Sequence, residues 1–204
     1  MAATEQRRLR SDGERSRQKI LRAAANLATI EGLEGISIGN LASHIGMSKS
    51  GLYAHFGSKE QLQLATIDAA LEIFNDDVVE PAQAPSDPLE RLRTLYERFF
   101  DHVERRVFPG GCFFAATSLE MGARPGPVRD RLAAVQSDFT ALLRSFATTA
   151  IERGELPAHE NPDRLAFELH AILLGADTKF VLYDDPAVMT LARDVVHHRL
   201  GATS

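Results

Sequence analysis

The stretch IGNLASHIGMSKSGLYAHF, residues 38–56, decides the fold of the N-terminal part of this chain. Ala42 is small enough for a second helix to cross the first closely, and Gly46 lets the chain reverse in a short turn. Leu52 then packs the second helix onto the first. This spacing predicts a helix-turn-helix, in which the second helix presents its N-terminal residues to the major groove of DNA. Many helical hairpins also contain alanine and glycine, so a hairpin without DNA-binding activity stays open at this point.

The rest of the chain has a helical hydrophobic period and no alternating strand pattern. Ser37, Ser48, Ser58, Asp87 and Asn161 precede apolar-periodic segments and are typical helix N-caps. We therefore expect an all-α fold of about nine helices, the first of them from about Gly13 to Glu31. The expected breaks between helices are Gly32, Gly46, Gly57, the proline-rich segment 80–88, the turn 109–111, the turn 124–127, Gly154 and Pro186.

Length and composition are those of an ordinary globular protein. The chain has 204 residues, of which 44% are hydrophobic and 25% charged, which excludes collagen-like and wholly disordered classes. There is no apolar run long enough for a membrane span and no apolar stretch behind the N-terminal arginines, so we expect neither a span nor a secretory signal. The single cysteine, Cys112, favours a reducing cytoplasm. We expect a flexible arm (1–12), a helix-turn-helix domain (13–60) and a larger helical domain (61–204).

Charge is distributed unevenly along the chain. The net charge is −5, yet residues 1–60 hold nine Lys or Arg and six Asp or Glu, a balance of +3. The remaining 14 basic and 22 acidic residues give −8. Such asymmetry indicates a basic contact module on an acidic body, although an excess of three charges can also arise by chance.

From Gln18 to Leu64 the sequence resembles the DNA-binding domain of the tetracycline-repressor (TetR) family of bacterial regulators. The matching stretches are KILRAA at 19–24, EGLEG at 31–35 and IGMSKSGLYAHFGSKEQL at 45–62. The length of the chain and its all-helical remainder are also similar to that family. The resemblance implies a three-helix helix-turn-helix domain followed by a larger helical domain for ligand binding and dimerisation.

The resemblance also assigns DNA contacts residue by residue. Lys49 is the best candidate for reading guanine, because an ammonium can donate to O6 and N7. Tyr53 and His55 match phosphate contacts of the family, although packing remains an alternative for both. Lys59 stands beside a helix N-terminus, where the helix dipole also favours phosphate. The full set of expected DNA-binding residues is Ser37, Ser48, Lys49, Ser50, Gly51, Tyr53, His55 and Lys59.

Three positions depart from the family pattern. Gly39 stands where relatives often carry a polar or basic residue, and it costs about 1 kcal/mol of helix propensity. Ala28 replaces a frequent aromatic residue of the first helix, so other side chains must fill that space. Ala54 replaces the second tyrosine of a tyrosine pair that is frequent in the family. This replacement should reduce the number of contacts to the DNA backbone.

Ten of the eleven phenylalanines follow residue 60, and most of them must belong to the core. A minority can line an apolar pocket between helices. Cys112 is either a redox sensor or, more often for a lone cysteine beside aromatic residues, a small buried hydrophobic residue. The expected ligand-binding residues are Tyr96, Phe99, Cys112, Phe113, Glu120, Phe139, His170 and Asp177, with the three polar members other than cysteine as anchors.

These observations together predict a ligand-responsive DNA-binding regulator. The resemblance implies a homodimer formed by the last two helices, a pseudo-palindromic operator of double-stranded DNA and release by a small-molecule inducer, usually as a repressor. We find no catalytic Ser/His/Asp set, phosphate-binding glycine loop or persuasive metal site, so we expect no enzyme, cofactor or metal. Two alternatives stay open: a helical enzyme or small-molecule binder that merely contains this hairpin, and a TetR-like protein that acts through a protein partner with little specific DNA binding.

Overall fold

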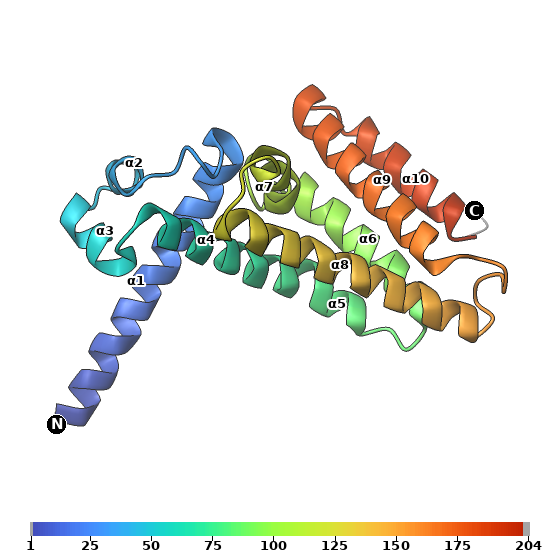
Figure 1. The fold of residues 1–204 in the computed structure, drawn as a ribbon. Coiled ribbons are helices and arrows are strands. Elements are labelled where there is room, and N and C mark those ends of the chain that lie inside the picture. The colour runs from blue at the N-terminus through green and yellow to red at the C-terminus, as the bar shows by residue number, and fades with distance from the viewer. Residues whose placement is uncertain (1, 202–204) are drawn as a thin grey trace.

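The computed structural model describes residues 2–201, and all regular elements in that range are helical. This confirms the all-α prediction, with ten α-helices and one π-helical segment where about nine helices were expected. The elements are α1 (Ala2–Glu31), α2 (Ile38–His44), α3 (Lys49–Phe56), α4 (Lys59–Phe74), η1 (Asn75–Val79), α5 (Glu80–Gln83), α6 (Pro88–Glu104), α7 (Phe113–Met121), α8 (Pro127–Glu152), α9 (Pro162–Tyr183) and α10 (Ala187–Arg199). Helices α1–α3 form one end of the molecule, α4 leads from them into an elongated bundle, and α9 and α10 lie side by side along its flank (Figure 1).

The helix-turn-helix forms at the predicted residues, and its helix starts and its turn have local causes. Ser37 and Ser48 are the N-caps of α2 and α3, and their side chains accept hydrogen bonds from the backbone N–H groups of Asn40 and Gly51. Gly46 has a φ of +68°, a conformation that favours glycine, and it reverses the chain between the two helices. Buried side chains form the contact between α2 and α3: Ala42 is 2% exposed and Leu52 is 0% exposed.

The first helix begins earlier than expected. Helix α1 starts at Ala2, so Gly13 lies inside it and does not mark its beginning. One glycine costs only about 1 kcal/mol in a helix interior, and the flanking Glu, Gln and Arg residues favour helix. The side chains of residues 1–12 lie outside the described part of the chain, so the flexible arm stays a prediction.

The proline-rich segment also differs from expectation. A break was expected across 80–88, but the helix that begins as α4 continues through η1 and α5 to Gln83. The wider π-helical turn allows this, because the Glu80 N–H bonds back five residues to the Asn75 carbonyl. Pro81 then stands in the first turn of α5, where a missing N–H is tolerated. The chain leaves helical structure only before Asp87, which caps α6 as predicted.

Three polar contacts join the helix-turn-helix end to the bundle. The Glu120 carboxylate at the end of α7 accepts from the backbone N–H groups of Leu33 and Glu34, at 2.7 and 2.9 Å, in the turn between α1 and α2. The Gly110 N–H donates to Thr29 Oγ1 at 3.1 Å. The Arg22 guanidinium donates to the Val107 carbonyl oxygen at 2.5 Å and lies 5.1 Å from the ring centroid of Phe108. The loop between α6 and α7, with α7 itself, therefore helps α4 to fix the position of the helix-turn-helix end.

Candidate DNA-binding surface and ligand pocket

Helix α3 presents a polar face to solvent. Ser48, Lys49, Ser50 and His55 are exposed, and Tyr53 retains 58% of its surface. Leu52 and Phe56 are buried against the other helices, whereas Ser48 and Lys49 are accessible because they stand at the N-terminal end of α3. The exposure of Tyr53 rules out the interpretation that it merely fills the core. Five residues expected to contact DNA therefore share one accessible surface.

Three further candidates are partly engaged in local interactions. The Lys59 ammonium forms an ion pair with Glu34 Oε1 at 2.7 Å, and this hydrogen bond is the main reason why the pKa of the Glu34 carboxyl is lowered. The Ser37 hydroxyl completes a capping box with Asn40, whose side chain accepts from the Ser37 N–H at 2.6 Å. The Gly51 N–H is taken by the Ser48 hydroxyl at 3.1 Å. Neither Glu34 nor Asn40 was singled out in the sequence, although the spacing of Asn40, three residues after a serine N-cap, could have indicated the capping box.

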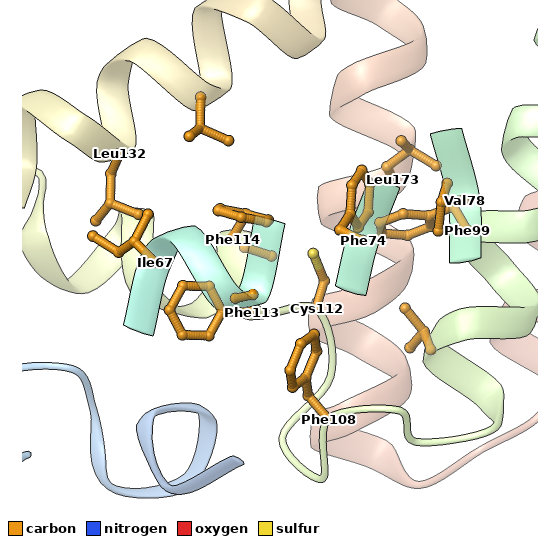
Figure 2. Close-up of a cluster of buried hydrophobic side chains, with 14 of the residues drawn as sticks. Ile67, Phe74, Val78, Phe99, Phe108, Cys112, Phe113, Phe114, Leu132 and Leu173 are labelled. Atoms are coloured by element: carbon orange, nitrogen blue, oxygen red, sulfur yellow. The ribbon is translucent and has the colours of Figure 1, made fainter. Parts of the chain in front are cut away.

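The bundle encloses a cavity of about 210 Å³ between α4, η1, α6, α7, α8 and α9. The walls combine aliphatic side chains with four phenylalanine rings, in which Phe74 makes edge-to-face contacts to Phe99, Phe114 and Phe139 at centroid distances of 6.4, 5.8 and 5.6 Å. Figure 2 shows the sulfur of Cys112 facing the space between Phe114 and Phe74. Such a chamber suits a small, largely apolar molecule.

The π-helical segment η1 contributes directly to this cavity. Asn75 and Val79, its first and last residues, both line the wall. Single π-helical turns are frequent at functional sites. The element that departs most from the expected secondary structure is therefore part of the pocket.

The structure brings four of the expected ligand-binding residues to the cavity and places four elsewhere. Phe99, Cys112, Phe139 and His170 line it. Tyr96 is buried within the core, Phe113 packs against Phe108 and Phe114, Glu120 binds the turn after α1, and Asp177 binds the loop before α7. The lining residues that sequence reasoning did not single out for the site include Phe114, Asn75 and Gln136. Phe74, which is likewise absent from the expected ligand-binding residues, lines the cavity and contacts three of the other aromatic rings in its wall.

Comparison with known proteins identifies both parts of the chain. Residues 20–66 match the family model described as bacterial regulatory proteins of the tetR family, and residues 88–196 match the tetracyclin repressor-like C-terminal domain. The chain belongs to the TetR family. This confirms the resemblance seen in residues 18–64. It also extends the family assignment to the helical bundle, for which the sequence analysis had no matching motif.

Individual relatives agree with this assignment. The regulator LmrA of Bacillus subtilis (strain 168) is 30% identical over 110 residues, which are 52% of this chain and 58% of LmrA. For LmrA and two further curated regulators, the alignments span 40–58% of their lengths. A TetR regulator from Chloroflexus aurantiacus J-10-FL superposes with a TM-score of 0.86 at 26% identity, covering 95% of this chain and 98% of that one. AibR, solved with isovaleryl coenzyme A and operator DNA, superposes with a TM-score of 0.71 at 25% identity, covering 89% and 97%.

The described residues show neither a metal-binding cluster nor a membrane-spanning helix. Among the side chains of residues 13–201, no group of three or more His, Cys, Asp or Glu is arranged to hold a metal ion. Within the same range no helix combines the length and the apolar character needed to cross a bilayer.

The environment of Cys112 bears on its chemistry in this TetR-family protein. The side chain is buried, and burial together with the nearby Asp177 carboxylate raises the pKa of the thiol to about 12. Only the thiolate reacts readily with oxidants or electrophiles, and at neutral pH almost none is present at such a pKa. This favours Cys112 as a small apolar wall residue over a redox sensor.

Asp177 is a buried carboxylate that organises the loop before α7. It is 4% exposed, and its Oδ1 accepts from the backbone N–H of Cys112 at 2.7 Å. Burial raises the pKa of this carboxyl to about 6, above its ordinary value of 3.8. As pH rises, an unfolded chain loses this proton before the folded chain does. Asp177 therefore lowers the free energy of unfolding progressively between about pH 4 and pH 6, and the full cost is present above that window.

Asp177→Asn is expected to stabilise the protein at neutral pH. The amide oxygen can still accept from the Cys112 N–H, while the buried charge is removed. We expect a gain of about 2 kcal/mol at pH 7.5, because each pKa unit corresponds to about 1.4 kcal/mol and the new amide N–H groups offset part of it. Urea denaturation at pH 7.5 and pH 4.5 would measure the effect, and the gain should shrink at the lower pH. Exposed Asp76→Asn is the control, and an equal gain for both variants would contradict the assignment.

Proposed function

We propose that this TetR-family protein is a ligand-responsive transcriptional regulator that binds a pseudo-palindromic operator as a homodimer, acts as a repressor and is released by a small-molecule inducer. The observation that carries the proposal is the pairing, in one chain, of an exposed polar α3 with an aromatic cavity in the bundle. AibR, a structural neighbour solved with both a ligand and operator DNA, supports the same combination. A DNA partner also accords with the cytoplasmic location expected from the single cysteine.

The dimer is supported by the exposed face of the last two helices. Helices α9 and α10 carry five of the large apolar side chains that remain most exposed: Phe167, Leu182, Tyr183, Leu191 and Val195, with exposed fractions from 41% to 74%. Phe167 and Val195 line one shallow depression between the two helices, and exposed apolar groups that lie together mark an interaction surface. A two-fold axis at this face would place two copies of α3 at the two half-sites of an operator.

Helix α7 offers a physical route from the cavity to α3. Its first turn, with Phe114 and Ala115, forms part of the cavity wall. Its last turn carries Glu120, which holds the N–H groups of Leu33 and Glu34 at the start of the connection to α2. A ligand that favours a different position of α7 would therefore shift the helix-turn-helix as well. In thermodynamic terms, the ligand and the operator prefer different positions of this helix.

Glu120→Ala is expected to loosen this connection without unfolding the protein. The variant leaves two backbone N–H groups without their carboxylate, so amide exchange at Leu33 and Glu34 should accelerate at least about tenfold, a loss of about 1.4 kcal/mol of local protection. Operator affinity should fall by a similar factor because α3 is held less firmly. Hydrogen exchange read by mass spectrometry or NMR gives the first quantity and a binding titration the second. Exposed Glu152→Ala on α8 is the matched control, and unchanged exchange at Leu33 would refute the proposed role.

The proposed function is tested by selecting genomic fragments with the purified protein and measuring their affinity at two salt concentrations. We expect an inverted repeat that binds far more tightly than random DNA, with a salt dependence set by the number of phosphate contacts. Binding that is equal for all sequences and disappears at the higher salt concentration would overturn the proposal.

A further inference from the structure

We propose that the cavity binds an uncharged aromatic molecule of one or two rings, with one hydrogen-bonding group directed at His170. This inference rests on the proposed ligand-responsive function and specifies the chemical class of the ligand. It is carried by three observations: the charges of the lining residues, the size and shape of the chamber, and the position of its polar groups.

The lining provides no positive charge for an anion. Asp138 is the only formally charged side chain among the residues that line the cavity, and it is exposed at the mouth. His170 lies at the wall and is partly buried, and burial lowers its pKa, which keeps the ring neutral at physiological pH. A charged group enters an apolar chamber favourably only with a partner of opposite charge. Carboxylates, phosphates and acyl-coenzyme A molecules therefore lack a counter-charge inside, and they meet the Asp138 carboxylate at the entrance.

The size of the chamber limits the ligand to a compact molecule. An apolar cavity of about 150 Å³ in another protein is known to hold benzene. The cavity here is about 210 Å³, which leaves room for a substituted ring or two fused rings. The rings of Phe99, Phe114 and Phe139 stand edge-to-face around Phe74, an arrangement that favours a flat aromatic guest because ring edges and faces attract one another.

His170 defines the polar end of the chamber. Its Nδ1 lies 3.4 Å from the Thr140 hydroxyl, a long contact, and its ring stands edge-to-face to Phe139 at 5.5 Å. Gln136, another polar lining residue, already donates to the Ser118 hydroxyl at 2.9 Å. A neutral imidazole has one donor and one acceptor nitrogen, so it can bind a hydroxyl or a carbonyl. Asn75 also lines the cavity. We assign the hydrogen bond to His170 because its ring is in edge-to-face contact with Phe139, one of the aromatic wall residues.

Direct binding to the purified protein, without DNA, tests the proposal with a matched set of probes. Calorimetry at pH 7.5 would compare 2-naphthol, naphthalene, 2-naphthoate and a naphthylmethylammonium ion, which share one ring system and differ in charge and hydrogen bonding. We expect 2-naphthol to bind about three- to tenfold more tightly than naphthalene, as one neutral hydrogen bond would give. 2-Naphthoate should bind at least about a hundredfold more weakly than 2-naphthol, because no lining side chain offers it a positive charge. The ammonium ion should bind at least about tenfold more weakly, because Asp138, the one carboxylate of the lining, is exposed to solvent.

Substitutions at the polar end and in the wall of the cavity distinguish a loss of ligand recognition from a loss of folding. His170→Phe should reduce the affinity for 2-naphthol to that for naphthalene and leave naphthalene unchanged within about twofold. Ala115→Leu, which fills the cavity, should abolish binding of both, whereas Ala116→Leu on the same helix, outside the lining, should not. Thermal unfolding of each variant checks that it is folded, and His170→Gln provides a second variant if the phenylalanine is not accommodated.

Tighter binding of 2-naphthoate, the ammonium ion or an acyl-coenzyme A than of 2-naphthol would overturn the proposal, as would equal binding to the Ala115→Leu variant. Because no DNA is present in these measurements, their failure is distinct from failure of the regulator itself. A protein that selects an inverted repeat yet rejects every neutral aromatic probe would refute the ligand class and leave the proposed function intact.

Discussion

The Gly110→Ala variant is expected to lose about 3 kcal/mol or more of stability and to detach the helix-turn-helix from the bundle. A Cβ atom at this position would lie 2.6 Å from the carbonyl carbon of Thr29 in α1 and closer still to its oxygen. Both neighbours are backbone atoms, so no side chain can rotate away, and the loop must move back from α1. Overpacking of this kind usually costs 1–3 kcal/mol, with larger values where backbone blocks relief. The shift also breaks the hydrogen bond from the Gly110 N–H to Thr29 Oγ1.

Thermal and urea unfolding would measure this loss of stability. Limited proteolysis would report whether the helix-turn-helix has separated from the bundle, since the contact between α1 and the loop before α7 would then be open. Gly39→Ala is the matched control, because its new Cβ would meet nothing nearer than Ser37 Oγ at 3.8 Å. That change replaces a glycine in the first turn of α2 and should instead stabilise the protein by about 0.5 kcal/mol. Equal stability of Gly110→Ala and the wild type would show that the loop does not hold α1 in the way the structure indicates.

The Lys49→Ala variant is expected to bind its operator about ten- to hundredfold more weakly while remaining a folded protein. Lys49 is the first residue of α3 and is exposed, so its loss removes no buried contact. A contact to a guanine edge is worth about 1–3 kcal/mol of discrimination, and its removal relaxes the preference at that base pair. A contact to phosphate alone would weaken binding to all sequences alike and reduce the salt dependence by about one unit.

Fluorescence anisotropy with the selected operator and with operators substituted at single base pairs would distinguish these results. Lys179→Ala, exposed on α9, removes the same charge far from α3 and controls for the change in net charge. Unchanged affinity of Lys49→Ala for operator would mean that α3 does not read DNA through this residue. It would then favour a TetR-like protein that acts mainly through another partner.

The local sequence was sufficient to predict the elements that depend only on neighbouring residues. Ser37, Ser48, Asp87 and Asn161 cap the helices that they were expected to cap, because a cap needs only a side-chain oxygen and N–H groups two or three residues later. Gly46 turns the chain for an equally local reason. Two predictions of helix ends were wrong. Helix α1 begins before Gly13, because a single glycine does not prevent a helix among residues that favour one. The helix also continues through Pro81, because the π-helical turn before it accommodates a proline.

The candidate site was only partly accessible to sequence reasoning. Phe99, Phe139 and Phe113 were expected alike to line the ligand pocket, and nothing in the sequence separated the first two, which line the cavity, from Phe113, which does not. Glu120 and Asp177 were expected to be polar anchors of the pocket, but the structure places both outside the lining and uses them to bind backbone N–H groups. Their partners, the N–H groups of residues 33, 34 and 112, are distant in sequence, and no periodicity could reveal them.

The outward position of Lys49 was expected only from the family resemblance. By itself the sequence determined that this chain is all-helical, that residues 38–56 have the spacing of a helix-turn-helix and that Leu52 and Phe56 face inward, which leaves Tyr53 outside the core. These properties depend on the spacing of apolar residues along single helices, and that spacing is written in the order of the amino acids. Only the tertiary structure decided which helices meet: that Lys59 pairs with Glu34, that Gly110 touches α1, and that four phenylalanines from four helices surround one cavity. The reason is physical, since the helical period fixes which side of a helix is buried and leaves open what that side is buried against.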